Sequence, residues 1–399
     1  MSDVEAEISR VSALTRQLLT EYAAWGNKIV VGEVGNMMYD DMTEFVNLRM
    51  ETVESCLWLL KAGKVADALG LCRSLLEHYL LYMLMCRGNK YFRLQDRADL
   101  TESKFKEYLA ERQAAQIKEA ADGKTNCIGV EKYPRAKRHV MYIYEGVKAK
   151  DEPEFVIPVH YFHFQDFHPE TMRLPEGDYF SYRDIGEIGK EAMKRHRENA
   201  TERYRFYLSY DALLQCLELN GLVDKAALTR IEAHYTFLGK FLHPTHGAAR
   251  DLHVDRNHHK GGTSAGLPQP YSPVATLLAN IYVCYLVASL VDEIAGLFEA
   301  ASTKYFSDVA TAELRELTKR IRDEFSYFWF LFNEPTLYDK FLYASAQATA
   351  EEWAELGGRY ESVPSDRVKF SKDIYKHFGD SLNGWSNNRC RYRSPLEGR

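Results

Sequence analysis

The chain has 399 residues, of which 46% are hydrophobic and 27% are charged, so it can bury a large core and is not a disordered chain. Its formal net charge of -6 at pH 7 excludes binding of nucleic acid over the whole surface, so a local basic patch would be needed. The seven cysteines form no C-x-x-C pair, which favours reduced thiols in a cytoplasmic protein. The N-terminal segment carries acids and no apolar run, so we expect no signal peptide.

Apolar residues recur at helical spacing through most of the N-terminal third of the chain. Helices are predicted over residues 4 to 25, 37 to 60, 65 to 87 and 101 to 121. The K-A-G-K corner at 61 to 64 predicts that the second and third helices form an antiparallel hairpin, and Gly88 suits the C-cap of the third. We therefore predict an N-terminal helical hairpin region over residues 1 to 122.

The following segment, residues 123 to 185, has a different pattern. Glycine and proline are scattered through it, and E-F-V-I-P-V-H-Y-F-H-F-Q-D-F-H-P is β-branched and aromatic. This composition predicts an irregular insertion with room for a short β-hairpin.

Helical patterns return after the insertion. They cover residues 185 to 219, 224 to 242, 273 to 300, 307 to 332 and 335 to 356. Asp224 is a candidate N-cap of the second, and Ser272 with Pro273 suits the start of the third. We predict a C-terminal bundle over 186 to 356 that packs on the first region, followed by a polar, basic and partly disordered tail over 357 to 399. The expected fold class is all-α: an antiparallel helical bundle with an irregular insertion.

One predicted helix contains eighteen residues without a charge, 274 to 291, which is near the minimum length of a membrane span. It contains Asn280 and Ser289, Asp292 follows at once, and basic flanks are missing. We interpret the segment as the buried central helix of the bundle and expect no membrane partner.

A first group of candidate site residues lies in the apolar stretch L-C-R-S-L-L-E-H-Y-L-L-Y-M-L. Arg73 and Glu77 are four residues apart and share one helix face, and His78 follows. Because a buried charge must be paired, one interpretation is an internal salt bridge that fixes helix packing. The other is a polar site in the bundle that binds an anion through Arg73.

A second group lies in F-L-G-K-F-L-H-P-T-H-G, at the start of a histidine-rich loop. Pro244 predicts that the helix ends near Leu242, so His243 and His246 are expected at a helix C-terminus. There they could act as acid/base groups, contact a phosphate or simply cap the helix. Their H-x-x-H spacing invites a metal but departs from the usual zinc patterns, so we predict no bound metal and no cofactor.

A third group is the basic run of residues 190 to 207, whose neighbouring tyrosines and phenylalanine could stack on bases. It is either a local RNA-binding surface or a solvated helix face with i,i+4 ion pairs. The candidate RNA-binding residues are Lys194, Arg195, Arg197, Arg203 and Arg205.

Arg73 to His78 read R-S-L-L-E-H, and this R-x4-H pattern in a helical hairpin resembles the motif of the HEPN superfamily. The resemblance implies a dimeric, metal-independent RNase of the kind found in bacterial toxin and phage-defence systems. R-S-L-L-E together with the later F-L-H-P also resembles bacterial helical proteins that carry an R-s-l-l-E helix and a later helix ending in F-L-x-H-P. Arg73 and His78 are about 140° apart on a helix, so they would share a substrate only across a dimer seam or at a bend.

Two main hypotheses follow. In the first, the chain is an endoribonuclease in which Arg73 stabilises charge, Glu77 orients a partner, and His78 or His243 and His246 transfer protons. Its partners would be RNA, a second copy of the chain, and a partner protein or antitoxin. In the second, the chain is a non-enzymatic helical sensor or scaffold with a structural Arg/Glu/His cluster. A third, weaker hypothesis is a metal site built from Glu77, His243 and His246.

Overall fold

The computed structural model describes the chain in segments. Backbone is described for residues 3–29, 37–88, 90–96, 101–125, 127–132, 137–144, 159–166, 204–207, 210–243, 245, 247–253, 270–301, 309–384 and 392–397. Side chains are described over the same residues, except 37, 38, 102 and those of the five strands.

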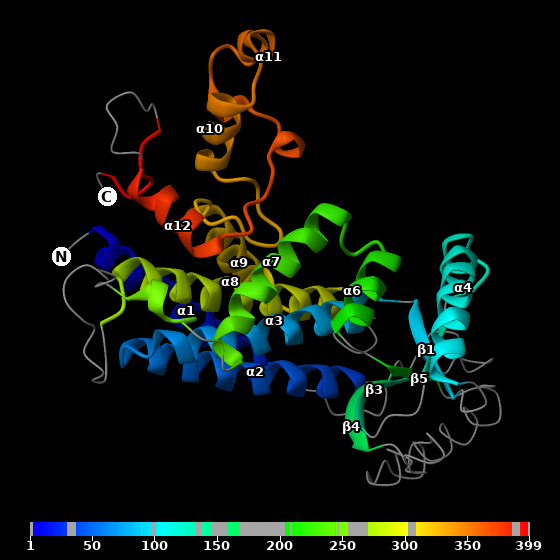
Figure 1. Cartoon of the computed structure of the whole chain (residues 1–399). Helices are drawn as coiled ribbons and strands as arrows, with labels where there is room; N and C mark the ends of the chain where they lie inside the picture. The colour runs from blue at the N-terminus through cyan, green and yellow to red at the C-terminus, as the bar shows by residue number, and fades with distance from the viewer. Residues whose placement is uncertain are drawn as a thin grey trace.

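The predicted helical bundle is confirmed (Figure 1). Its helices are α1 (Asp3–Gly26), α2 (Met37–Lys61), α3 (Val65–Arg87), α6 (Tyr210–Leu219), α7 (Lys225–Leu242), α8 (Pro273–Glu299) and α9 (Ala312–Glu324). The predicted boundaries hold at several caps: the Asp224 side chain accepts from Ala227 N, that of Ser272 accepts from Val274 N, and Gly88 is the C-cap of α3. Local capping chemistry therefore sets where α7 and α8 begin.

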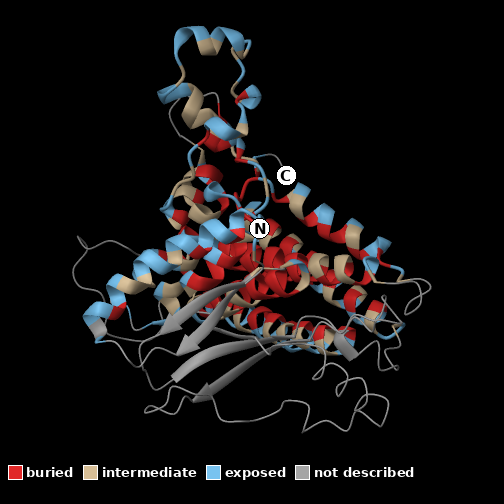
Figure 2. Cartoon of the chain, turned by 90° about the vertical axis from the view of Figure 1, so that its right-hand side faces the viewer, coloured by how far each residue is buried: buried red, intermediate tan, exposed pale blue. Residues whose placement is uncertain are grey.

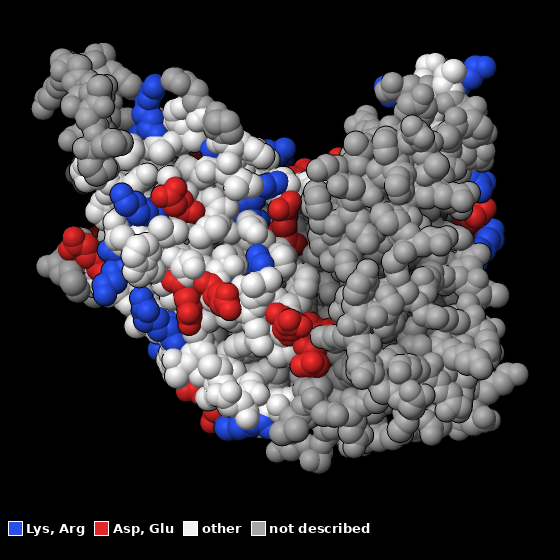
Figure 3. Space-filling model, turned by 90° about the horizontal axis from the view of Figure 1, so that it is seen from below, with Lys and Arg blue, Asp and Glu red and all other residues white. Residues whose placement is uncertain are grey.

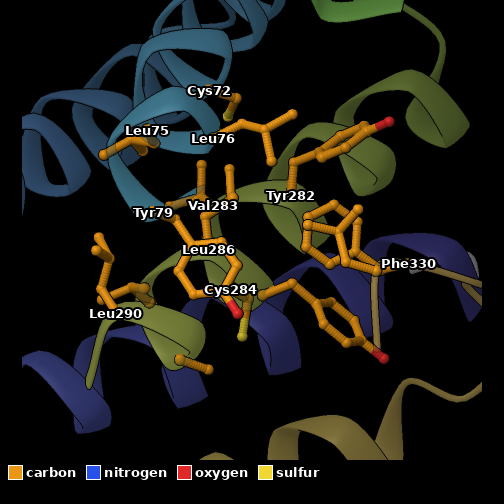
Figure 4. Close-up of a cluster of buried hydrophobic side chains, with 14 of the residues drawn as sticks. Cys72, Leu75, Leu76, Tyr79, Tyr282, Val283, Cys284, Leu286, Leu290 and Phe330 are labelled. Atoms are coloured by element: carbon orange, nitrogen blue, oxygen red, sulfur yellow. The ribbon is translucent and has the colours of Figure 1, made fainter. Parts of the chain in front are cut away.

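The uncharged helix α8 lies at the centre of the bundle, as predicted. It contacts α1, α2, α3 and α9. By length and composition α8 could cross a membrane, but 89% of its most apolar 18-residue stretch is buried inside the protein. Figure 4 shows Leu76 and Tyr79 of α3 close to Val283 and Leu286 of α8, and Figure 2 shows the buried residues gathered along this axis. A helix that is apolar all round requires a cover on every side, which the surrounding helices provide.

A mixed five-stranded sheet, with α4 (Glu102–Ala121), lies beside the bundle. The strand order is β2-β1-β5-β3-β4, with β1 and β2 parallel and the other neighbours antiparallel. The strands are β1 (Tyr91–Asp96), β2 (Cys127–Lys132), β3 (Lys137–Tyr144), β4 (Val159–Asp166) and β5 (Tyr204–Tyr207). The predicted hairpin is present as β3 and β4.

Two strands lie where the sequence analysis did not expect them. The segment 185–219 was predicted to be helical, but Tyr204–Tyr207 forms β5 and only the part from Tyr210 is helix α6. β1 falls between two predicted helices. Both segments are aromatic, and their pairing with distant strands decides their conformation over local pattern.

The C-terminal part also departs from prediction. The helix expected over 307–332 corresponds to α9, which ends at Glu324. The helix expected over 335–356 is divided into α10 (Leu337–Ala346) and α11 (Ala350–Glu355), and a capping box at Thr349 starts the second of these. These two helices form an arm that projects from the bundle (Figures 1 and 2). The predicted polar tail contains α12 (Ile374–Asn383), whose Ile374, Phe378 and Leu382 are buried against the bundle.

Asp292 of α8 holds α9 in place through a shared carboxylate. Arg315 and Arg322 of α9 both pair with it, and Thr318 donates to it at 3.2 Å. Burial acts to raise the pKa of Asp292, but the hydrogen bonds and charges of the two arginines outweigh it and hold the pKa below its ordinary value.

Replacing this carboxylate by an amide, Asp292→Asn, is expected to lower the free energy of unfolding by about 2 kcal/mol at neutral pH, because two arginines lose their shared partner. Since the folded-state pKa lies below the unfolded-state value, the contribution is complete above about pH 4 and disappears as the pH falls through the folded-state pKa. Urea unfolding across this pH range measures the difference. The control is Glu316→Gln, an exposed acid on α9. A difference that does not shrink in acid would contradict the assignment.

Candidate functional site

Arg73 lies on the face of α3 that packs against α7. Its side chain is 9% exposed and pairs with Glu77 Oε1 at 3.4 Å, one turn further along α3, whereas the Glu77 side chain is 41% exposed. The predicted Arg73–Glu77 pair is therefore present, with a buried cation and a carboxylate that reaches solvent.

Tyr235 of α7 completes this pair from the facing helix. The Arg73 guanidinium lies over the Tyr235 ring, 3.8 Å from its centre, and donates to the Tyr235 hydroxyl. The same hydroxyl donates to Glu77 Oε1 at 3.0 Å. We call Arg73, Glu77 and Tyr235 the Arg73 clamp, because a cation–π contact and charge-assisted hydrogen bonds join α3 to α7 through them.

A third helix contacts the clamp through Tyr210 of α6. Its ring stacks on Tyr235 with centres 3.4 Å apart. Burial, followed by the charge of Glu232, raises the pKa of Tyr210 above its ordinary value, so the hydroxyl stays neutral. The aromatic column extends the clamp to α6 without adding a charge.

Two glycines allow α3 and α7 to approach closely around the clamp. A Cβ on Gly70 would lie 3.3 Å from the carbonyl oxygen of Phe241, and one on Gly239 would lie 3.7 Å from Cδ of Arg73. The Gly70 contact is tight, so the missing side chain at this position allows the two backbones to approach, whereas a Cβ on Gly239 would make an ordinary contact with the Arg73 side chain.

His78, the second half of the R-x4-H pattern, lies on another side of α3. Its ring packs on Phe45 of α2, with centres 4.5 Å apart. Burial, and then the charge of Arg49, lowers the pKa of His78 to about 3, so its imidazole is neutral at physiological pH. Within one chain, the structure therefore directs Arg73 and His78 toward different helices.

The histidines after α7 are only partly described. His243 is the C-cap of α7 and is exposed, as its position before Pro244 predicted, whereas His246 lies outside the described residues. His253 stacks on Tyr271 with ring centres 4.4 Å apart. Among the residues that the structure describes, no three His, Cys, Asp or Glu side chains are grouped as a metal site.

The candidate RNA-binding residues lie mainly outside the described part of the chain. This applies to Lys194, Arg195, Arg197 and Arg203, whereas Arg205 pairs with Tyr142 through the backbone of β5 and its side chain is not described. On the face of the molecule seen in Figure 3, described basic and acidic side chains are interspersed.

A groove of about 890 Å³ lies along the side of α7 that faces away from the clamp, a volume typical of small-molecule sites. α7, α12 and the start of α8 contribute to its walls, and Lys240 and Lys372 are among its charged residues. Its apolar lining includes Phe237, Phe241, Leu252, Val274 and Ile374. α7 is thus a shared wall, with Tyr235 in the clamp and Phe237 in the groove.

Arg73 and Glu77 were predicted from the sequence as site residues, whereas Tyr235 and Tyr210 were not. The signal in the sequence was weak: Tyr235 lies four residues from both Ile231 and Gly239, which places it on the stripe of α7 that packs inward. No protein-family model, curated protein or solved structure matches this chain. The resemblance to HEPN proteins therefore stays a prediction.

The two glycines of the α3–α7 interface give a matched test. Alanine in a helix interior is favoured over glycine by about 1 kcal/mol, so Gly239→Ala, whose Cβ makes an ordinary contact, is expected to raise the free energy of unfolding. Gly70→Ala forces its Cβ against backbone and is expected to be less stable than Gly239→Ala by about 1–3 kcal/mol. Chemical unfolding of both variants measures the difference, and equal stabilities would show that the helices are less closely packed.

Proposed function

We propose that this chain is a non-enzymatic helical sensor or scaffold in which the Arg73 clamp is structural. The observation that supports this best is the closed state of the clamp. The Arg73 cation is buried, lies over an aromatic ring, and has Glu77 and the Tyr235 hydroxyl as partners. Nε of Arg73 is buried without an acceptor, but a guanidinium held by a carboxylate, a hydroxyl and a ring stiffens a helix interface and leaves little charge for a substrate.

The groove beside α7 supports the sensor part of the proposal. A small molecule in it would contact Thr236 and Phe237 of the helix whose next face carries Tyr235. Because α7 is held to α3 by the clamp, a ligand that shifts α7 would act directly on the clamp. Such a ligand shifts the equilibrium between two positions of α7 only to the extent that it binds one position more tightly than the other.

A second candidate function is the metal-independent endoribonuclease, acting as a homodimer in toxin or phage-defence systems. Two observations favour it: the Glu77 carboxylate is 41% exposed, and His243 is exposed at the end of the same helix that carries Tyr235. In this mechanism Arg73 stabilises the phosphorane charge, His243 and His246 transfer protons, and Glu77 orients a partner. His78 is the least suited of the candidates, because its neutral imidazole cannot serve as an acid near pH 7.

The structural role of the clamp predicts a large loss of stability without Arg73. Arg73→Ala is expected to lower the free energy of unfolding by about 2–3 kcal/mol, and Tyr235→Phe, which keeps the ring, by about 1 kcal/mol. Urea unfolding measures both, with Arg16→Ala, an exposed arginine on α1, as control. If Arg73→Ala is as stable as Arg16→Ala, the clamp is not structural and the proposal fails.

Incubation of the purified chain with tRNA and total RNA separates the two functions. The sensor or scaffold is expected to leave both intact in the absence of metal. Cleavage that is lost in His243→Ala while its unfolding curve is unchanged would establish the endoribonuclease instead. His253→Ala, a histidine packed on Tyr271, is the matched control because it should cleave like the parent chain.

A further inference from the structure

The groove beside α7 has an apolar side and an acidic edge. On its α7 wall, Phe237 and Phe241 lie about 100° and 140° round the helix from Thr236. Glu232 lies about 40° round in the opposite direction, toward the face that carries Tyr235. The acid and the aromatic rings are therefore at different edges of the groove, and an apolar ligand body has a wall to pack against.

Three of the four acids in the groove lining are already engaged within the protein. Asp380 pairs with Lys376 at 2.6 Å, and the Asp373 side chain accepts from Lys376 N as the N-cap of α12. Asp251 also interacts with another group of the chain. Among the described lining residues, Glu232 is thus the acid left without such a contact, and it lies away from the aromatic rings.

Two lysines of the lining, Lys240 and Lys372, have no acid beside them. Both are exposed, and no ion pair joins either of them to another described residue. Lys240 lies in the last turn of α7, about 40° round from Thr236 on the same side as Phe237. Lys372 lies just before α12. Together with Glu232 they leave the groove with an excess of one positive charge, which a single carboxylate would balance.

These features fit a ligand that is apolar at one end and anionic at the other. An apolar body gains free energy by leaving water for the rings of Phe237 and Phe241. A lysine packs its methylene stem along apolar surface and keeps its ammonium in water, so each lysine can donate to a head group at the rim. The volume of about 890 Å³ is in the range of sites that enclose small organic molecules.

We propose that this groove binds an amphipathic monoanion, a carboxylate with an apolar body such as a medium-chain fatty acid. The apolar body lies against Phe237, Phe241 and Ile374, and the carboxylate accepts hydrogen bonds from Lys240 and Lys372. This inference rests on the proposed sensor function, and it names the class of ligand that would shift α7.

Isothermal titration of the full chain with decanoate, below the concentration at which it forms micelles, tests the ligand class. Decanoate is expected to bind saturably and at least about tenfold more tightly than decanol or decyltrimethylammonium, because these keep the apolar chain and lack the anionic head. Acetate, which has the head without the chain, is expected to show no measurable binding.

The variants remove the two ammonium groups without touching the apolar wall. Lys240→Gln and Lys372→Gln are each expected to weaken decanoate binding at least about threefold, and the double variant at least about tenfold, since charge-assisted hydrogen bonds are lost. Their affinity for decanol should stay unchanged. Lys225→Gln, an exposed lysine on α7 outside the groove, is the matched control and should bind decanoate like the parent chain.

The proposal is overturned if decanoate binding does not saturate, if decyltrimethylammonium binds as tightly, or if the folded double variant binds decanoate as well as Lys225→Gln. Coupling to the clamp is measured separately, because Tyr235→Phe is expected to change the affinity for decanoate at least about twofold if the ligand shifts α7. Binding without this change keeps the ligand and rejects the sensor. No binding, together with an unstable Arg73→Ala, keeps the scaffold and rejects the ligand.

Discussion

The structure depends on the need to cover α8 on every side. This helix has no charge from Val274 to Val291, and nearly all of that stretch is buried. α1, α2, α3 and α9 supply the cover, and the first charged residue after the stretch, Asp292, is used at once to hold α9. Because α3 must turn an apolar face toward α8, its polar residues are left for the contacts with α7 and α2. The positions of Arg73 and His78 follow from this division of the α3 surface.

Helices whose pattern repeats over many residues could be predicted from sequence, and segments decided by distant partners could not. α3 and α8 carry long apolar patterns, and α7 has a side-chain cap at Asp224, so local information was sufficient. β5 is four residues long and obtains its conformation from β1 and β3. In the same way, the aromatic run Phe325–Phe332 continued the apolar pattern of α9, but its rings pack on Tyr282 and Tyr285 instead of extending the helix.

The candidate site shows the same limit. Helical spacing places Arg73 and Glu77 on one face and His78 on another, and both placements were predictable from 3.6 residues per turn. What the spacing could not supply was the identity of the facing residues, since Tyr235 and Phe45 are separated from α3 by long stretches of chain. These two residues decide the chemistry. A tyrosine hydroxyl joins both members of the arginine–glutamate pair, whereas the histidine packs on a phenylalanine ring, and burial followed by the charge of Arg49 lowers its pKa.

Two arginines near the same helix thus differ in whether an acid pairs with them. Arg73 is neutralised within its interface by Glu77 and the Tyr235 hydroxyl, and its charge acts mainly between α3 and α7. Nε is buried without a hydrogen-bond acceptor in both arginines, but no ion pair joins Arg49 to another described residue, and Glu51 is the carboxylate that acts on its pKa. Desolvation penalises a charge less when a partner of opposite sign is present, and Arg73 has such a partner in Glu77. The R-x4-H pattern therefore joins two separate environments within one chain, because the arginine packs against Tyr235 of α7 and the histidine against Phe45 of α2.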